Sequence, residues 1–325
     1  MDPRNPTGPV PSRARTRVAL ALVLAVLATI VLQAPSVLSA AMAPAAPVAA
    51  EVEPSQDVPT LPQECIRYAI IPPVPVACHL TPYRAKRPTV VLWGDSHAWQ
   101  YIPAVRNAAI ARGANLTAFV LGGCPPVKVP IDRAPRNPKS CATNNYLAMK
   151  YVMRLQRGDQ DVRVLLGSHW AGYRRAARES TIGPLAPLFG YDETTQGKVE
   201  LFQSSAAALF PALGRVGVDV DVIGQTATVP RLTLPCAAGE EPYSCDVLRA
   251  RAIYDEDETE TWLRERMQDL AGTPRLIDVN SAYCGQLMCR GIQDGIHTFY
   301  DDLHLSATRT DTLTRFFTPS MRALR

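Results

Sequence analysis

The feature that most constrains the fold is the stretch 90–97, Val-Val-Leu-Trp-Gly-Asp-Ser-His. Four apolar residues lead directly into a glycine and then into Asp95, Ser96 and His97, and a helical apolar pattern covers residues 99–112. A buried parallel strand that ends in a tight turn and opens a helix has this pattern. Small molecules bind beyond the carboxyl ends of such strands, so the pattern places the Ser96 hydroxyl at a candidate site.

Ser96 admits two interpretations. At a helix N-terminus, free backbone N–H groups favour developing negative charge, but a serine there can also simply cap the helix. A catalytic role needs a base, and Asp-Asp-Leu-His-Leu-Ser at residues 301–306 offers one. An Asp three residues before a His lets one turn carry Asp301 and His304 to the same site, where Asp301 fixes the imidazole tautomer and His304 takes the serine proton. His97 is expected to shape the turn rather than to act as the base.

Three motifs resemble those of the SGNH (GDSL-like) hydrolases: Gly-Asp-Ser-His at 94–97, Gly-Gly-Cys-Pro-Pro at 122–126 and the 301–306 motif. The chain is most similar to the extracytoplasmic SGNH domain found with acyltransferase family 3 membrane proteins, which O-acylate surface glycans. The resemblance covers residue 61 to the C-terminus. It implies that Ser96 is the nucleophile, His304 the base and Asp301 its partner, with no cofactor and no metal.

The resemblance also implies an oxyanion hole. Its donors would be the backbone N–H of Ser96 and that of Gly122 or Gly123, because a glycine turn allows close approach of an oxyanion. The third family block is usually Gly-x-Asn, and Gly-Ser-His-Trp occupies its place at residues 167–170. His169 therefore replaces the Asn as the candidate third donor, and a merely packed histidine is the alternative.

Two aromatic residues follow this block. Trp170 and Tyr173 could stack on the apolar face of a sugar ring and so bind substrate. A position in the core or at the rim of the site is the alternative for both residues.

The fold is predicted as a three-layer α/β/α sandwich with a mainly parallel sheet, the SGNH version of a flavodoxin-like fold. The 325 residues, 47% of them hydrophobic, suffice for one such core. The strands are expected at 89–93, 116–121, 162–166, 218–223 and 276–279, and further helices at 144–157, 198–213, 255–270 and 306–324. Asp219 and Asp221 predict one wetter face for the fourth strand.

The first 62 residues are predicted to lie outside this domain. An apolar run at 18–32 follows several arginines, which keep the N-terminal end in the cytoplasm. Residues 1–43 are therefore read as a cytoplasmic stub and signal anchor or signal peptide, with the anchor favoured. Residues 44–62 form an Ala/Pro-rich linker that tethers the catalytic domain, residues 63–325.

Charge and cysteines restrict the function further. The net charge of +4 sits largely in the leader, so no nucleic-acid partner is expected. The eight cysteines fall into four neighbouring pairs, and sequential pairing is favoured because the two partners of each pair lie in the same loop-like segment. A metal site is the alternative, but no Cys-x-x-Cys spacing occurs and the histidines are scattered. Oxidised pairs indicate export. The expected disulfides are Cys65–Cys78, Cys124–Cys141, Cys236–Cys245 and Cys284–Cys289.

These features and the resemblance imply an exported, serine-dependent O-acyltransferase or esterase that acts on acyl esters, most simply acetyl esters, of cell-surface carbohydrate through an acyl-Ser96 intermediate. Transfer is favoured, and the alternatives are a purely hydrolytic carbohydrate esterase and a catalytically silent glycan-binding SGNH module. Because the chain holds at most one membrane span, a separate multi-span acyltransferase family 3 membrane protein is expected as acyl donor. The protein is expected in the periplasm or cell envelope, tethered to the cytoplasmic membrane by its N-terminal segment. If the leader is cleaved, the protein is expected to be secreted.

Overall fold

The computed structural model describes residues 53–65, 77–129, 141–175, 195–229, 245–253, 255–322 and 324. All of them belong to one compact unit, Val52–Arg325. Within these residues no helix combines the length and the apolar composition that crossing a membrane requires. The expected membrane segment at 18–43 and Cys236 of the expected Cys236–Cys245 pair lie outside the described residues.

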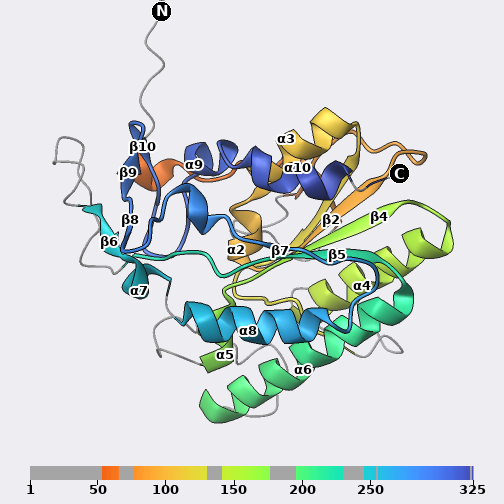
Figure 1. The fold of residues 1–325 in the computed structure, drawn as a ribbon. Helices are drawn as coiled ribbons and strands as arrows, with labels where there is room; N and C mark the ends of the chain where they lie inside the picture. The colour runs from red at the N-terminus through yellow and green to blue at the C-terminus, as the bar shows by residue number, and fades with distance from the viewer. Residues whose placement is uncertain are drawn as a thin grey trace, which may run out of the picture. The chain divides into compact units, whose positions relative to one another are not determined.

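A six-stranded sheet forms the centre of the unit, in the order β1-β3-β2-β4-β5-β7 (Figure 1). Five strands run parallel, and only the short edge strand β1 pairs antiparallel, with β3. Among the parallel strands the second in sequence lies outside the first, which is the doubly wound order of flavodoxin-like folds. The predicted fold class is confirmed. The strands are β1 (Cys78–His79), β2 (Thr89–Gly94), β3 (Asn115–Val120), β4 (Val162–Gly167), β5 (Asp219–Ile223) and β7 (Leu276–Ile277).

Strand β2 shows why the apolar run has no polar alternation. All six of its residues are buried, and successive side chains enter different cores. Val90 and Leu92 pack in one hydrophobic cluster, whereas Val91 and Trp93 pack in the other. A parallel strand covered by helices on both faces needs apolar residues at every position.

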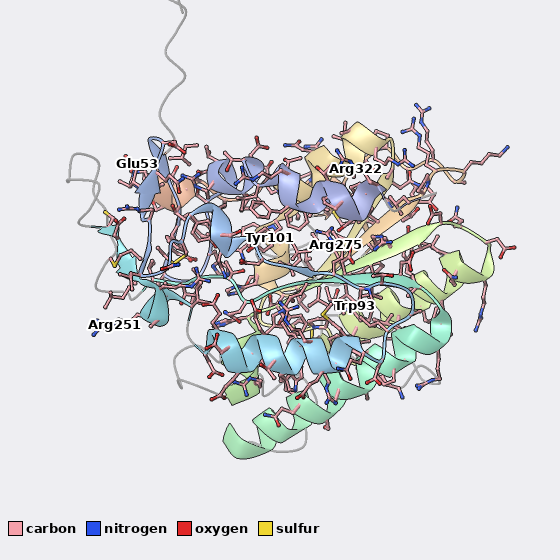
Figure 2. The ribbon with its side chains drawn as sticks, viewed as in Figure 1. Glu53, Trp93, Tyr101, Arg251, Arg275 and Arg322 are labelled. Atoms are coloured by element: carbon pink, nitrogen blue, oxygen red, sulfur yellow. A yellow bond between two sulfur atoms is a disulfide. The ribbon has the colours of Figure 1, made fainter. Side chains whose placement is uncertain are left out.

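The helices form two layers, one on each face of the sheet (Figure 1). Figure 2 shows Tyr101 and Trp93 on opposite sides of the sheet, each in the core of one layer. The first layer contains α3 (Ile102–Arg112), α9 (Ala307–Asp311) and α10 (Thr314–Arg322). The second contains α4 (Cys141–Arg157), α6 (Thr195–Val216) and α8 (Glu256–Met267). Short elements complete the unit: α2 (Ser96–Trp99), α5 (Trp170–Arg175), α7 (Arg249–Ala252), β6 (Val247–Leu248), β8 (Met288–Cys289), β9 (Ile292–Gln293) and β10 (Ile296–His297).

The C-terminal helix differs from its prediction in one respect. Ser306 caps it as expected, with its hydroxyl accepting the backbone N–H of Arg309 at 3.1 Å. The helix is not continuous, because α9 ends at Asp311 and α10 begins at Thr314.

The expected wetter face of β5 is only half correct. The Asp219 side chain is 44% exposed, but that of Asp221 is fully buried. Arg163, the neighbouring residue on β4, lies 3.1 Å from each carboxylate. The sequence pattern of β5 alone could not show that a cation from another strand compensates the buried charge.

Three of the four predicted disulfides are confirmed: Cys65–Cys78, Cys124–Cys141 and Cys284–Cys289. Cys65–Cys78 joins the segment 53–65 to the edge strand β1. This pairing fixes the start of the folded unit to the sheet.

The last part of the expected linker packs against the folded unit. The backbone carbonyl of Asp57 accepts the N–H of Ala307 at 2.8 Å, and its carboxylate accepts that of Thr308 at 3.1 and 3.2 Å. Val58 and Leu61 pack against the core of the α3 side. Asp57, Val58 and Leu61 therefore hold this segment against the folded unit.

Candidate active site

The nucleophile candidate lies where the strand order reverses. Chain connections leave β2 toward β3 on one side, and β4 lies on the other, so the carboxyl ends of these strands form the topological switch point at which doubly wound folds bind ligands. Gly94 and Gly167 end these two strands in direct register. A Cβ at Gly94 would collide with the carbonyl oxygen of Gly167, so only glycine permits this approach. Ser96, the first residue of α2, is partly exposed at this edge.

The structure brings the three predicted triad residues together. The Ser96 Oγ lies 2.7 Å from His304 Nε2, and His304 Nδ1 lies 2.8 Å from Asp301 Oδ2. Asp301 Oδ1 also accepts the backbone N–H groups of Leu303 at 2.8 Å and of His304 at 2.7 Å. The turn thus fixes the carboxylate, the carboxylate orients the imidazole, and the imidazole can take the serine proton.

The environment keeps Asp301 charged. Burial would raise the pKa of Asp301, but hydrogen bonds from the His304 side chain and from two backbone N–H groups outweigh it and lower the pKa. A carboxylate ionised at neutral pH can stabilise the imidazolium that forms when His304 accepts a proton.

Tyr300 is a residue of this site that the sequence analysis missed. Its ring stacks on that of His304, with 5.5 Å between centroids and 9° between planes. Its hydroxyl bonds to Asp301, and burial together with that carboxylate raises the pKa of Tyr300. The only signal in the sequence was its position directly before Asp301.

A second carboxylate, Asp95, joins the nucleophile turn to the loop after β4. It is fully buried and accepts the backbone N–H of His97 at 2.8 Å. It also accepts the Ser168 hydroxyl at 2.8 Å and the His169 backbone N–H at 3.0 Å. The Tyr173 hydroxyl is a further donor. Burial raises the pKa of Asp95 despite these four hydrogen bonds.

Two more histidines pack beside His304. His97 and His169 stack with 4.5 Å between ring centroids and 11° between planes, and the His97 ring lies 5.1 Å from that of His304. Neither ring nitrogen of His97 has a hydrogen-bond partner among the described residues. Burial, and secondarily the neighbouring histidines, lowers the pKa of His97 well below its usual value. His97 contributes its backbone N–H to the turn, as predicted, but its ring also packs against the base.

His169 stands where the family pattern has Asn. Its ring packs against Gly172 of α5, where a Cβ would come within 2.6 Å of the His169 Nδ1. Burial, and then the charge of His304, lowers the pKa of His169 to about 4. At neutral pH its imidazole is therefore neutral and carries one N–H that can donate a hydrogen bond.

The two candidate oxyanion glycines form a turn after β3. The Cys124 N–H donates to Leu121 O at 3.0 Å and closes the turn, while the Leu121 N–H donates to Gly94 O at 3.1 Å. Gly123 has a φ of 64°, which glycine adopts without strain. Both glycines are exposed, and neither N–H has a hydrogen-bond acceptor among the described residues. The turn lies beside the end of β2 and offers free donors there.

The predicted substrate-stacking role of Trp170 and Tyr173 is wrong for this structure. Trp170 is fully buried, and its indole N–H donates to the carbonyl of Ile223 at 2.8 Å. Tyr173 is 7% exposed, packs on Phe202 and bonds to Asp95. Both residues fill the core between α5 and the second helix layer, which was the alternative interpretation. A periodicity reading cannot tell which face of a short helix points inward.

The described residues contain no cluster of three or more His, Cys, Asp or Glu side chains that could hold a metal ion. The groups at this edge are the Ser96 hydroxyl, its imidazole and carboxylate partners, and the nearby N–H donors.

Comparisons with known proteins show which family the chain resembles. A family model described as the SGNH domain (fused to AT3 domains) matches residues 64–319. No curated protein matches the chain. Among solved structures, the periplasmic domain of a lipopolysaccharide acetyltransferase from Salmonella ser. Paratyphi A is 14% identical, with a TM-score of 0.47, covering 74% of this chain and 85% of that one. A carbohydrate acetylesterase family member from Sinorhizobium meliloti is 14% identical, with a TM-score of 0.31, covering 72% and 97%.

Proposed function

This chain belongs to the family of SGNH domains fused to AT3 domains, and from that premise we propose that it is a serine-dependent enzyme acting on acetyl esters of cell-surface carbohydrate. The observation that carries the proposal is the 2.7 Å contact between Ser96 Oγ and His304 Nε2, with Asp301 on the opposite ring nitrogen. Residues separated by 208 positions meet there in the arrangement that nucleophilic acyl transfer requires.

In the first half-reaction, the Ser96 oxygen attacks the carbonyl carbon of the donor ester while His304 Nε2 takes the hydroxyl proton. The tetrahedral intermediate then collapses, its ester C–O bond breaks, and His304 returns the proton to the leaving oxygen. The product is acyl-Ser96. Asp301 holds the imidazole by Nδ1 throughout and balances its transient positive charge.

In the second half-reaction, an acceptor hydroxyl attacks the acyl-Ser96 carbonyl and gives its proton to His304. The Ser96–acyl bond breaks, and the proton returns to the serine oxygen. Water as acceptor makes the enzyme an esterase, and a sugar hydroxyl makes it an O-acyltransferase. We favour transfer, with the acyl group delivered by a separate multi-span acyltransferase family 3 protein.

Both half-reactions develop negative charge on the carbonyl oxygen. The backbone N–H groups of Ser96 and of Gly122 or Gly123 are our candidates for its donors, since those of the glycine turn have no other acceptor among the described residues. The neutral imidazole of His169 is the candidate third donor in place of the family's Asn.

The location follows in part from the disulfides. Three of them in the described residues indicate an oxidising, extracytoplasmic compartment. A tether to the cytoplasmic membrane through the N-terminal segment remains our proposal, and a cleaved leader would release the domain instead.

The test is turnover of an activated acetate ester by the purified protein, with Ser96→Ala as the comparison. We expect release of the leaving group by the wild-type protein and its loss in the variant, accompanied by loss of a covalent acetyl adduct in mass spectrometry. If the wild-type protein is as inert as Ser96→Ala, the enzymatic proposal is wrong. In that case binding of acetylated glycan without turnover would favour the silent glycan-binding module.

A second assay separates transfer from hydrolysis. Adding a soluble glycan acceptor to the ester reaction should give acetylated glycan at the expense of free acetate if the enzyme transfers. Acetate released in constant yield, whatever the acceptor concentration, would identify a hydrolytic esterase.

A further inference from the structure

Gln100 lies where the nucleophile and the base segments meet. It follows α2 directly, and its backbone N–H donates to the carbonyl of Ser96 at 3.0 Å. Its side chain is fully buried, at 0% exposure. A buried primary amide has to satisfy one acceptor and two donor positions, so its partners show what it holds together.

Each of those partners belongs to a different part of the site. The side-chain oxygen of Gln100 accepts the backbone N–H of Leu305 at 2.7 Å, and Leu305 is the residue directly after His304. Its side-chain nitrogen donates to the carbonyl of His97 at 3.1 Å, and His97 is the residue directly after Ser96. One planar group therefore spans the two segments that carry the nucleophile and the base.

A third contact fixes the amide itself. The Gln100 nitrogen also donates to the Thr226 hydroxyl, 3.2 Å away, and that hydroxyl bonds to the Tyr101 hydroxyl at 2.8 Å. Thr226 lies in the loop after β5 and is 1% exposed. Because both ends of the amide are hydrogen-bonded within a buried network, the amide has one orientation and holds its partners at fixed positions.

The Gln100 amide controls the distance between the Ser96 hydroxyl and the His304 imidazole, across which the proton moves in the reaction. Ser96 and His304 lie 208 positions apart in the sequence. The short contact between Ser96 Oγ and His304 Nε2 therefore persists only while the distance between their two backbone segments is unchanged. A shift of about 1 Å at such a site can cost on the order of 100-fold in rate.

We infer that Gln100 is a positioning residue for the acyl-transfer reaction, setting the spacing between the nucleophile segment, residues 95–100, and the base segment, residues 300–305. This inference rests on the proposed function. It predicts that the loss of the Gln100 amide slows the chemical step and leaves substrate binding unchanged.

The test replaces Gln100 by Met in the full chain, which keeps the length of the side chain and removes its three hydrogen bonds. With the activated acetate ester, kcat should fall on the order of 100-fold at unchanged KM. Folded fraction is measured by circular dichroism and thermal unfolding, and kcat is expressed per folded molecule.

Asn115→Leu is the matched control. Asn115 is another buried amide, 1% exposed, but it lies at the start of β3, the opposite end of the parallel strands. Its side chain bonds to Arg84, Arg87 and Thr89. This variant should lose stability and keep its kcat per folded molecule.

Gln100→Glu supplies a conservative variant should the methionine fail to fold. Burial raises the pKa of a carboxyl, and the neutral acid retains one acceptor and one donor. Its kcat relative to wild type should rise as the pH is lowered. If residue 100 only stabilised the fold, protonation of the introduced carboxyl would not restore kcat per folded molecule.

The inference is overturned if Gln100→Met keeps the wild-type kcat, or if Asn115→Leu loses kcat to the same extent. A wild-type protein that does not turn over the ester would refute the proposed function, and the positioning role with it. An active wild type with an equally active Gln100→Met refutes the positioning role alone.

Discussion

Two fully buried aspartates in neighbouring parts of the sheet are held in opposite ways. Asp95, at the carboxyl end of β2, accepts hydrogen bonds only from neutral donors: two backbone N–H groups and the hydroxyls of Ser168 and Tyr173. Asp221, inside β5, faces the guanidinium of Arg163 at 3.1 Å and accepts the Arg275 N–H at 2.9 Å. Of the two, Asp221 alone has a cation beside it among the described residues.

The difference shows what each carboxylate contributes. An ion pair offsets the cost of burying a charge, and removing one partner mainly costs stability. Neutral donors offset the same cost less completely, and burial accordingly raises the pKa of Asp95. In return, four directional hydrogen bonds join the nucleophile turn to the loop of His169. Asp221 stabilises the sheet, whereas Asp95 sets the geometry of the site.

Asp221→Asn tests the structural half of this comparison and should have the largest effect. Arg163 would retain Asp219 but lose its fully buried partner, so we expect the free energy of unfolding to fall by about 3 kcal/mol. Urea-induced unfolding measures this loss. The kcat of the folded fraction should not change, and a parallel loss of kcat would show that this ion pair also shapes the site.

Asp95→Asn makes the same substitution in the other network. We expect kcat to fall on the order of 100-fold, equivalent to about 2.7 kcal/mol in the activation barrier. The asparagine NH2 replaces one of the two acceptor oxygens, so the donors of one loop then face another donor. The free energy of unfolding should fall less, by about 1–2 kcal/mol. Steady-state kinetics on the activated ester gives the first value, and an unchanged kcat would make the two aspartates equivalent.

The pH dependence of stability sharpens the comparison, since the backbones of His97 and of the half-buried His169 both donate to Asp95. Burial, and then His304, lowers the pKa of His169 to about 4, below its unfolded value of about 6.5. The unfolded chain therefore binds the proton more tightly, and the free energy of unfolding should decrease as the pH falls from about 6.5 toward 4, by about 2 kcal/mol.

Replacement of His169 by Gln should make this decrease shallower. His97 has a pKa shifted in the same direction and would retain its own share of it. Urea unfolding at several pH values measures the slope, and an identical slope in wild type and variant would mean that His169 does not titrate in this window.

Features of the sequence that act locally predicted most of the site. The apolar run into Gly-Asp-Ser-His placed Ser96, and the Asp-x-x-His spacing placed Asp301 beside His304, because one turn decides both side-chain positions. The neighbouring cysteines predicted three disulfides for the same reason. Gly113 ends α3 with a φ of 72°, where the apolar pattern predicted that the helix ends.

Features that depend on partners far along the chain escaped prediction. The sequence around Asp221 predicts a solvated residue, because its partner Arg163 lies on another strand. The sequence around Trp170 predicts an aromatic residue free to bind substrate, because Trp262, which packs against it, lies far along the chain. The contact between Gln100 and Leu305 joins residues 205 positions apart. The short antiparallel strand β1 has only two residues and gives no periodicity at all.

The two hydrogen bonds that Asp57 accepts at the start of α9 have a practical consequence for shortening the chain. A version cut before residue 53 keeps this anchor, whereas one cut after residue 57 exposes the first turn of a helix that begins three residues beyond His304. The shorter version should fray first at the first turn of α9. In the longer version, a force applied to the N-terminal segment would be transmitted to that turn through Asp57.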